Sequence, residues 1–225
     1  GHENERLVAE LTENDINIQN RLLQCAHITD ATVDRVEFGG LCETDVDCVL
    51  GGKTKSKTDM WLFLSNGKRL NVSIKKDEHG QVFLVGIERF ISGFELQYHK
   101  NIPDSVKRAI SLYFGSAVDT LEVINDFGST NKQLEIRKHR VVADTLKAYD
   151  GNLYHLLLNW FNENISELFD FCFAKGLASN SEDWAQIVWY KNMVGENQFD
   201  TMLYLEDFKS NIPPTIIPKN NTTER

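Results

Sequence analysis

The sequence has few of the residues that define several protein classes. It contains only 4 prolines and 4 cysteines in 225 residues, and no two cysteines are spaced as Cys-x-x-Cys. A disulfide framework is therefore not indicated. No apolar run approaches the roughly 18 residues that a membrane-spanning helix requires. The beginning of the sequence also lacks a signal-peptide pattern. We therefore expect a cytoplasmic protein with no membrane partner.

Positive charge is also scarce. The 24 Lys and Arg residues are outnumbered by 33 Asp and Glu residues, which gives a formal net charge of −9. This balance argues against a protein that binds nucleic acid by overall charge alone, because such proteins are usually basic. It leaves open a protein that concentrates its lysines in one place. The 41% of hydrophobic residues is typical of a globular chain, long enough for one large domain or two small ones.

Hydrophobic spacing predicts a mixed fold. Residues 3–24 have the apolar spacing of helices, with Thr12 and Asp15 as a possible capping box, and residues 30–58 have the composition of strands and loops. We therefore expect an α/β (α+β) fold with a central mixed β-sheet flanked by helices. Further helices are predicted over 81–98, 103–114, 117–127, 131–149 and 151–175, and at least one strand in each of 184–194 and 200–208.

The clearest element is a hairpin over residues 59–76 with its turn at Ser65-Asn66-Gly67. A two-residue Asn-Gly turn would mix polar and apolar side chains on both faces. A three-residue loop with Gly67 in the left-handed conformation instead gives one continuous apolar face, so we prefer that register. The apolar face then carries Met60, Leu62, Leu64, Leu70, Val72 and Ile74, and the other face carries Asp59, Trp61, Phe63, Asn71, Ser73 and Lys75.

An acidic and a basic side chain meet on the second face of this hairpin. In the preferred register Asp59 lies opposite Ser73, and Lys75 lies two residues further along the same face. Such a pair is often only a solvated cross-strand ion pair. Because Trp61 and Phe63 share this face, we expect it to be partly covered, so that Asp59 and Lys75 need partners.

The segment before Asp59 concentrates lysines and hydroxyl groups. Lys53, Lys55 and Lys57 alternate with threonine and serine in a chain that is acidic overall. Cations, hydroxyl donors and free backbone amides are the groups that contact phosphates. The segment therefore predicts a phosphate-binding loop, with a solvated surface loop as the alternative.

These residues together resemble a known family. Asp59, a hairpin turn and then Ser73-Ile74-Lys75 resemble the core of the PD-(D/E)XK nuclease superfamily, in particular type II restriction endonucleases. In one subgroup, serine replaces the usual second carboxylate and a glutamate on the following helix takes over its role, and Glu88 follows Lys75 at that kind of spacing. The resemblance covers about residues 50–95. Two departures are Thr58 in place of proline and a short Asp59-to-Ser73 spacing.

The resemblance implies a Mg²⁺-dependent endonuclease that hydrolyses double-stranded DNA, acting as a homodimer. Asp59, Glu88 and the main-chain carbonyl of Ile74 would hold the metal, Lys75 would orient the attacking water, and Ser73 would support them. The implied DNA-binding residues are Lys53, Lys55, Ser56 and Lys57. Residues 1–100 would form the restriction-endonuclease-like core, with its catalytic hairpin at 59–76. Residues 101–225 would form a mostly helical region that completes the domain and serves recognition or dimerisation.

Several alternatives stay open for the second carboxylate. Glu5 and Glu10 lie on the predicted N-terminal helix, and Asp77 and Glu78 follow Lys75 directly. Glu88 itself could be an ordinary surface residue. The alternative functions are a DNA repair or structure-specific nuclease and a non-catalytic acidic interaction domain.

Other polar groups give weaker signals. The basic stretch 132–140 could touch a DNA backbone or be a solvated helix face, and the segment 184–204 includes Lys191 and Asn192, which could read bases. The aromatic run 149–173 is more simply a core or dimer helix pair. Cys42 and Cys48 are interpreted as small buried groups. No zinc-binding spacing is found among His27, His79, His99, His139 and His155.

Overall fold

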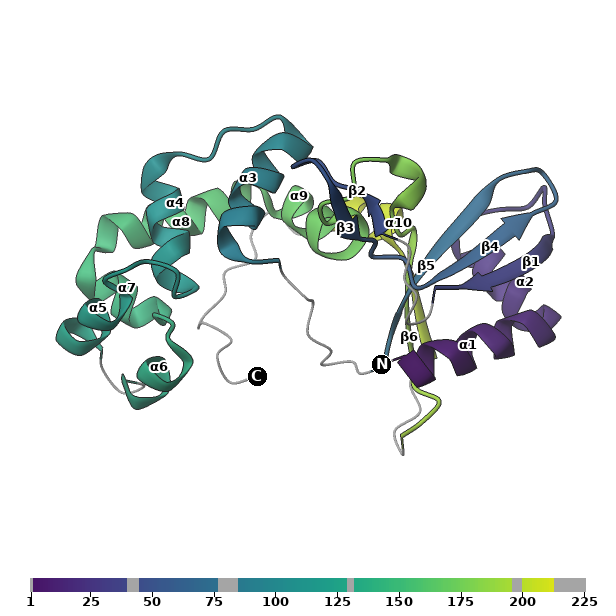
Figure 1. Ribbon diagram of the computed structural model, residues 1–225, viewed down its shortest axis with the longest axis horizontal. Helices are drawn as coiled ribbons and strands as arrows, with labels where there is room; N and C mark the ends of the chain where they lie inside the picture. The colour runs from purple at the N-terminus through teal and green to yellow at the C-terminus, as the bar shows by residue number, and fades with distance from the viewer. Residues whose placement is uncertain (1, 40–44, 77–84, 129–131, 196–199, 213–225) are drawn as a thin grey trace. The chain divides into compact units, whose positions relative to one another are not determined.

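The computed structural model describes residues 2–39, 45–76, 85–128, 132–195 and 200–212 (Figure 1). Its contacts divide the chain into two compact units. The first unit combines Gly1–Phe83 with Phe169–Ile212, and the second combines Leu84–Leu168 with Pro213–Arg225. The first unit therefore combines two segments that are separated in the sequence by Leu84–Leu168 of the second unit. No helix in the described ranges is long and apolar enough to cross a membrane.

The first unit is built on a five-stranded mixed sheet with the strand order β1-β4-β5-β6-β7. Its β5 and β6 strands are parallel, and the other neighbours are antiparallel. With helices flanking this sheet, the expected α/β fold class is confirmed. The strands are β1 (Val33–Phe38), β4 (Met60–Leu64), β5 (Arg69–Lys75), β6 (Ile187–Lys191) and β7 (Asp200–Tyr204), and a separate two-stranded sheet contains β2 (Asp45–Asp47) and β3 (Lys53–Lys55).

The β4–β5 hairpin has the register that its apolar face predicts. Met60 pairs with Val72 and Leu62 pairs with Leu70. Gly67 has a φ of 78°, the left-handed conformation that a three-residue loop requires. The six apolar side chains that were assigned to one face are all buried. The predicted three-residue turn and its register are therefore confirmed.

Both faces of the sheet are covered. One face packs against α1 (His2–Asn14) and α2 (Ile16–Cys25), which contribute Val8, Leu22 and other apolar side chains to the main core. On the other face a smaller cluster joins Val188 of β6 to Ala174 and Leu205. Ala174 lies in the π-helix η1 (Phe171–Lys175) and Leu205 begins α10 (Leu205–Ser210). The 3₁₀ turn η2 (Ser181–Asp183) precedes Ala185, a further member of this cluster.

The two N-terminal helices meet at Asp15. Its side chain accepts a 2.9 Å hydrogen bond from the Asn17 amide and so caps α2. Thr12 lies within α1 instead, where its hydroxyl donates to the Val8 carbonyl at 2.8 Å. The expected capping box between Thr12 and Asp15 is therefore wrong, because Thr12 bonds to its own helix.

The second unit is helical in its described residues. The expected single helix over 131–149 is wrong, because His139 takes a left-handed φ of 52° and ends α6. The expected helix over 151–175 is likewise interrupted, at Asn164. The helices are α3 (Ile87–Tyr98), α4 (Asp104–Tyr113), α5 (Thr120–Phe127), α6 (Lys132–Lys138), α7 (Ala143–Tyr149), α8 (Gly151–Glu163) and α9 (Ile165–Asp170), whose last two residues belong to the first unit.

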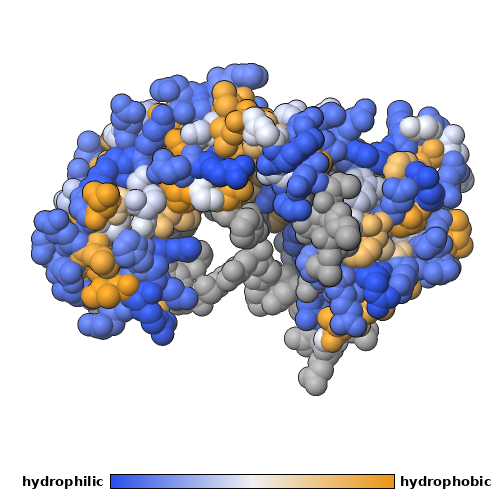
Figure 2. Space-filling model, viewed as in Figure 1, coloured by the Kyte–Doolittle hydropathy of each residue, from blue (hydrophilic) through white to orange (hydrophobic). Residues whose placement is uncertain are grey.

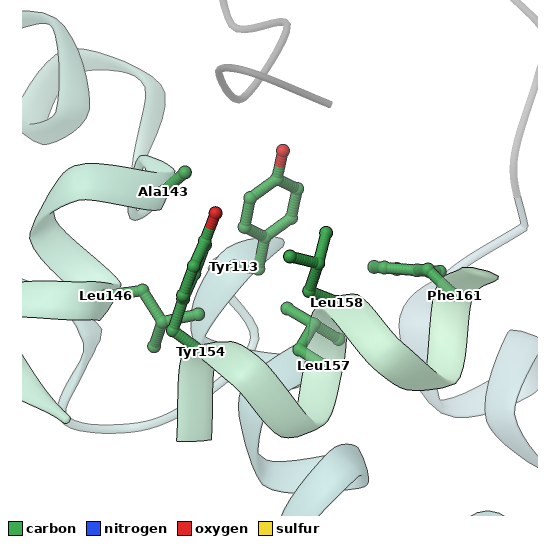
Figure 3. Close-up of a pocket in the computed structure, with 7 residues that line it drawn as sticks. All are labelled: Tyr113, Ala143, Leu146, Tyr154, Leu157, Leu158 and Phe161. Carbon is green, nitrogen blue, oxygen red and sulfur yellow. The ribbon is translucent and has the colours of Figure 1, made fainter. Parts of the chain in front are cut away.

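An apolar pocket lies among α4, α7 and α8 of the second unit (Figure 3). Two tyrosines, Tyr113 and Tyr154, stand among aliphatic side chains, and burial raises the pKa of Tyr113 to about 12. Trp160 of α8 packs against Phe94 at a centroid distance of 5.3 Å. Trp160, one residue of the aromatic run 149–173, is therefore part of the hydrophobic core of the second unit. The pocket is lined by Tyr113, Ala143, Leu146, Tyr154, Leu157, Leu158 and Phe161.

Candidate functional site

The candidate site lies at one edge of the five-stranded sheet. The antiparallel β4 begins at this edge just after Asp59, and β5 ends there at Lys75. Because β6 runs parallel to β5, with Lys75 beside Tyr190, the end of β6 lies at the same edge. We call this region, with Asp59, Ile74 and Lys75 at its centre, the Asp59 edge.

One oxygen of Asp59 is held by three groups of β5. Its Oδ2 accepts a 2.7 Å hydrogen bond from the Ile74 amide and a 3.2 Å hydrogen bond from the Ser73 hydroxyl. The Lys75 Nζ lies 3.6 Å from the same oxygen. None of the described residues donates a hydrogen bond to Oδ1 of Asp59. The carboxylate is therefore fixed through one oxygen, with the other available to a ligand.

The side chains differ in their access to solvent. Those of Asp59 and Lys75 are 25% and 28% exposed, so both can meet a ligand. Ser73 is only 1% exposed. Its hydroxyl therefore orients Asp59 and does not reach outward.

The main chain of Ile74 faces the Asp59 side of β5. Along this strand, the Asn71 carbonyl accepts a hydrogen bond from Gln186, whereas the Val72 carbonyl accepts one from Asp59, at 2.9 Å. Backbone groups alternate between the two neighbours of a strand, so Ile74 points its amide and carbonyl the same way as Val72. The Lys75 Nζ lies 3.4 Å from this carbonyl oxygen. The site therefore offers a carbonyl oxygen beside a carboxylate and an ammonium group.

Glu5 of α1 belongs to the same electrostatic neighbourhood. Burial raises the pKa of the Glu5 carboxyl, and the negative charge of Asp59 raises it further. Its side chain is 19% exposed and contacts His2 at 3.2 Å. Glu10 is exposed and pairs with Arg6 at 2.5 Å instead. Glu5 is therefore the N-terminal candidate with an electrostatic link to Asp59 in this structure.

Lys57 belongs to the segment that precedes Asp59, and it lies beside the site. Burial lowers the pKa of its ammonium group, and the charge of Lys75 lowers it further whereas that of Asp59 raises it. Its side chain runs over Gly176, where an added Cβ would lie only 3.0 Å from the Lys57 Cε. Burial raises the pKa of the Cys172 thiol to about 11, so this neighbour is neutral near pH 7.

The other predicted phosphate-binding residues lie in or beside the separate two-stranded sheet. Lys53 pairs with Asp47 at 2.7 Å, and Lys55 pairs with Asp45 at 2.9 Å. Ser56 donates a 2.7 Å hydrogen bond to the Asp183 carbonyl. The positive charge of Lys53 and Lys55 is thus partly compensated, which the composition of the segment did not indicate.

The predicted acid Glu88 lies in the first turn of α3, in the second unit, and is exposed. Its role therefore stays a prediction. The alternatives Asp77 and Glu78 lie outside the described residues, as do Cys42 and His79. Cys48 is buried, as expected.

Within the described parts of the chain, no three His, Cys, Asp or Glu side chains gather as a complete metal site. His99 and His139 adopt left-handed conformations at helix ends, and His27 contacts Asp207 at 2.6 Å. These positions are structural. The sequence missed Asn4, a buried residue beside Glu5 that bonds to the β6–β7 connection. No local signal marks it, because its partners lie far along the chain.

No protein-family model and no curated protein matches this sequence. Among solved structures, the chain is similar to the restriction endonuclease MspI in complex with its cognate DNA. That comparison has a TM-score of 0.43 and 12% sequence identity, and it covers 92% of this chain and 70% of the MspI chain. Site residues are not carried over from MspI to this chain at that identity.

Proposed function

We propose that this protein is a Mg²⁺-dependent endodeoxyribonuclease that hydrolyses phosphodiester bonds of double-stranded DNA. The observation that carries this proposal is the meeting of Asp59, the Ile74 carbonyl and Lys75 at one accessible edge of the sheet. Within this class, we propose a sequence-specific enzyme of the type II restriction kind that acts as a homodimer. Two active sites related by a two-fold axis would cut both strands of a palindromic site.

The donors at the Asp59 edge fit a hard cation. Carboxylate and carbonyl oxygens are the protein ligands that Mg²⁺ prefers, and Asp59 has an oxygen that no described donor occupies. Asp59 and the Ile74 carbonyl would therefore hold the ion together with a second carboxylate. When bound, the ion would polarise the scissile phosphate and acidify a water.

The remaining roles fall to side chains that do not bind the ion. Lys75 would orient the attacking water and stabilise the negative charge that develops on the phosphate. Ser73 keeps the Asp59 carboxylate in place through its 3.2 Å hydrogen bond. Lys57 would bring a second cation to the phosphate, and Lys53, Lys55 and Ser56 would contact the DNA backbone further along.

Two residues compete for the place of the second carboxylate. Glu5 is favoured by its electrostatic contact with Asp59 within the first unit. Glu88 is favoured by the Ser-x-Lys resemblance alone. Calorimetric titration with Mn²⁺ separates them, because Glu5→Gln or Glu88→Gln should weaken binding only where the carboxylate is a ligand.

Cleavage of plasmid DNA tests the proposed activity. The wild type should cut with Mg²⁺ or Mn²⁺, and Asp59→Ala or Lys75→Ala should lower the rate by about 100-fold or more. Lys68→Ala is a matched control, since Lys68 lies at the opposite end of the hairpin. Activity that survives both site variants would refute the assignment.

Two further outcomes separate the alternative functions. Fixed cut positions on a long DNA would indicate sequence recognition, whereas cuts at branched or damaged positions would indicate a repair or structure-specific nuclease. A wild type that neither cuts DNA nor binds Mn²⁺ would favour a non-catalytic interaction domain.

A further inference from the structure

The connection between β6 and β7 begins at the Asp59 edge. Tyr190 lies beside Lys75 in the parallel pair, and β6 ends one residue later at Lys191. Neighbouring strands are about 4.8 Å apart, and three further residues span at most about 10 Å. Met193 therefore lies within reach of whatever occupies the Asp59 edge.

The first part of this connection is tied to α1 by Asn4. The Asn4 Nδ2 donates a 2.8 Å hydrogen bond to the Lys191 carbonyl, and its Oδ1 accepts a 2.7 Å hydrogen bond from the Met193 amide. Asn4 is almost completely buried, with only 1% of the residue exposed. The loop and the helix that carries Glu5 are thus joined at one point.

Asn192 closes the loop on itself. Its Oδ1 accepts hydrogen bonds from the amides of Val194 and Gly195, at 3.1 and 2.9 Å. A Cβ at Gly195 would lie 2.6 Å from the Asn192 Nδ2, so a larger residue there would force the Asn192 side chain to move. Residues 191–195 therefore have a backbone fixed by two buried asparagines.

This fixed loop presents two apolar side chains to solvent. Met193 is 39% exposed and Val194 is 41% exposed, in the connection that follows β6 (Figure 1). Figure 2 shows hydrophobic residues as scattered patches among hydrophilic ones on the visible face. Isolated exposed apolar residues are common, but here a rigid loop holds two of them in sequence beside a candidate active site.

We propose that Met193 and Val194 form an apolar wedge that contacts the bases of double-stranded DNA next to the scissile phosphate. Flexible or branched apolar side chains serve in this way when they insert between base steps from a groove. Met193 lies at most about 10 Å along the chain from Tyr190, the strand neighbour of Lys75. This length is comparable to the depths of the DNA grooves, about 7.5–8.5 Å. With the backbone phosphate at Lys75, the wedge would meet the base edges.

This inference rests on the proposed function for its substrate, and it adds a contact that determines where DNA is held. A loop that is already ordered costs little entropy to bind, which explains why the buried asparagines fix its backbone. Asn4 acts as a positioning residue, because it touches the loop and not the DNA.

Binding of fluorescent duplex DNA in Ca²⁺ tests the wedge without cleavage. Met193→Ala/Val194→Ala should weaken the affinity by about tenfold or more, because apolar contact with the bases is lost. Hydrolysis of bis(p-nitrophenyl) phosphate with Mn²⁺ should be unchanged, since this small diester does not reach the loop. The matched control is Ile16→Ala, which removes a side chain that is 58% exposed on α2 of the same unit. It should alter neither measurement.

The outcomes separate the wedge from the proposed activity. If the double variant binds DNA with wild-type affinity, the wedge proposal is overturned. If its oligomeric state also changes, Met193 and Val194 instead mediate contact between copies of the protein. If the wild type binds DNA but hydrolyses neither substrate, the nuclease proposal fails while the binding assay still tests the wedge. A wild type that does not bind duplex DNA would refute both.

Asn4→Ala provides a second test of the loop. It should weaken DNA binding and increase hydrogen exchange at the Met193 amide. Loss of DNA affinity with an unchanged Met193 amide would contradict the positioning role.

Discussion

The amide of Ile74 donates a 2.7 Å hydrogen bond to Asp59 Oδ2, so the backbone of β5 fixes a side chain from the start of β4. The bond also aligns the Ile74 carbonyl beside the carboxylate. The same carboxylate influences Glu5, because its charge raises the pKa of the Glu5 carboxyl in addition to the larger effect of burial.

Replacing Asp59 by asparagine should therefore change Glu5. Asp59→Asn removes the neighbouring negative charge, so the pKa of Glu5 should fall towards its usual value of 4.5. A raised folded-state pKa means that ionisation of Glu5 opposes folding, and stability is lost as the pH rises above this usual value. Carboxyl NMR titration and urea unfolding at pH 4 and pH 7, about half a unit below this value and well above it, check both effects. An unchanged Glu5 pKa would show that the two carboxyls do not interact.

We expect Lys57 to lower the stability of the folded protein while it supports DNA cleavage. Burial is the largest effect that lowers the pKa of its ammonium group, so the charged form opposes folding at neutral pH. Lys57→Met should therefore raise the melting temperature while it weakens DNA cleavage. The stability gap should narrow as the pH rises towards the usual lysine pKa of 10.5, since the wild-type side chain then loses its charge. A variant that is both less stable and fully active would refute the trade-off.

Asp200 should contribute to stability above acidic pH. Burial alone would raise its pKa, but hydrogen bonds from Arg21, Trp189 and Lys191 outweigh burial and lower the pKa to about 2. Its stabilising effect is complete above the usual value of 3.8 and is lost as the pH falls towards about 2. Because the side chain is one-third exposed, we expect Asp200→Asn to cost about 1 kcal/mol at pH 7.

Urea unfolding across the acidic range checks the Asp200 prediction. The difference between wild type and Asp200→Asn should shrink below pH 3.8. Asp45→Asn serves as a control, because Asp45 is exposed and pairs with Lys55 at 2.9 Å near the surface. A difference that stays constant with pH would exclude the proposed charge effect.

Glu135 should stabilise the second unit. It is fully buried, and its carboxylate accepts hydrogen bonds from the Val142 amide at 2.8 Å and the Thr145 hydroxyl at 3.0 Å. It thereby caps the N-terminus of α7. Glu135→Ala leaves both donors buried and unpaired, which should cost about 2–3 kcal/mol.

Hydrogen exchange should locate the effect of Glu135→Ala in α7, with little change at the Asp59 edge. Glu122→Ala is the control, because Glu122 is exposed on α5. Equal destabilisation by the two variants would contradict the capping role.

Local patterns predicted the hairpin because its information lies in neighbouring residues. The alternation of apolar side chains and the need for a left-handed residue at Gly67 selected one register, which the structure confirms. The same reasoning predicts Asp59 and Lys75 on one face of the hairpin. In the structure the Lys75 Nζ lies 3.6 Å from the Asp59 Oδ2.

The remaining features depend on residues that are distant in sequence. The effect of Asp59 on Glu5 requires α1 to pack on the sheet, and no spacing within α1 indicates that contact. The ion pair between Lys53 and Asp47 likewise requires β2 and β3 to pair. His139 ended a predicted helix because a histidine can adopt the left-handed conformation without any glycine to mark the break.

The parallel pairing of β5 with β6 has a consequence for how the protein is made. Lys75 can pair with its neighbour Tyr190 only after Leu84–Leu168 of the second unit have been synthesised. Until then the nascent chain carries a hairpin whose β5 edge has no partner strand from β6, and the loop bearing Met193 does not yet exist. A chain truncated before β6 should accumulate as an aggregation-prone fragment that lacks a complete Asp59 edge. The order of synthesis thus delays completion of the Asp59 edge until β6, at Ile187–Lys191, has been made.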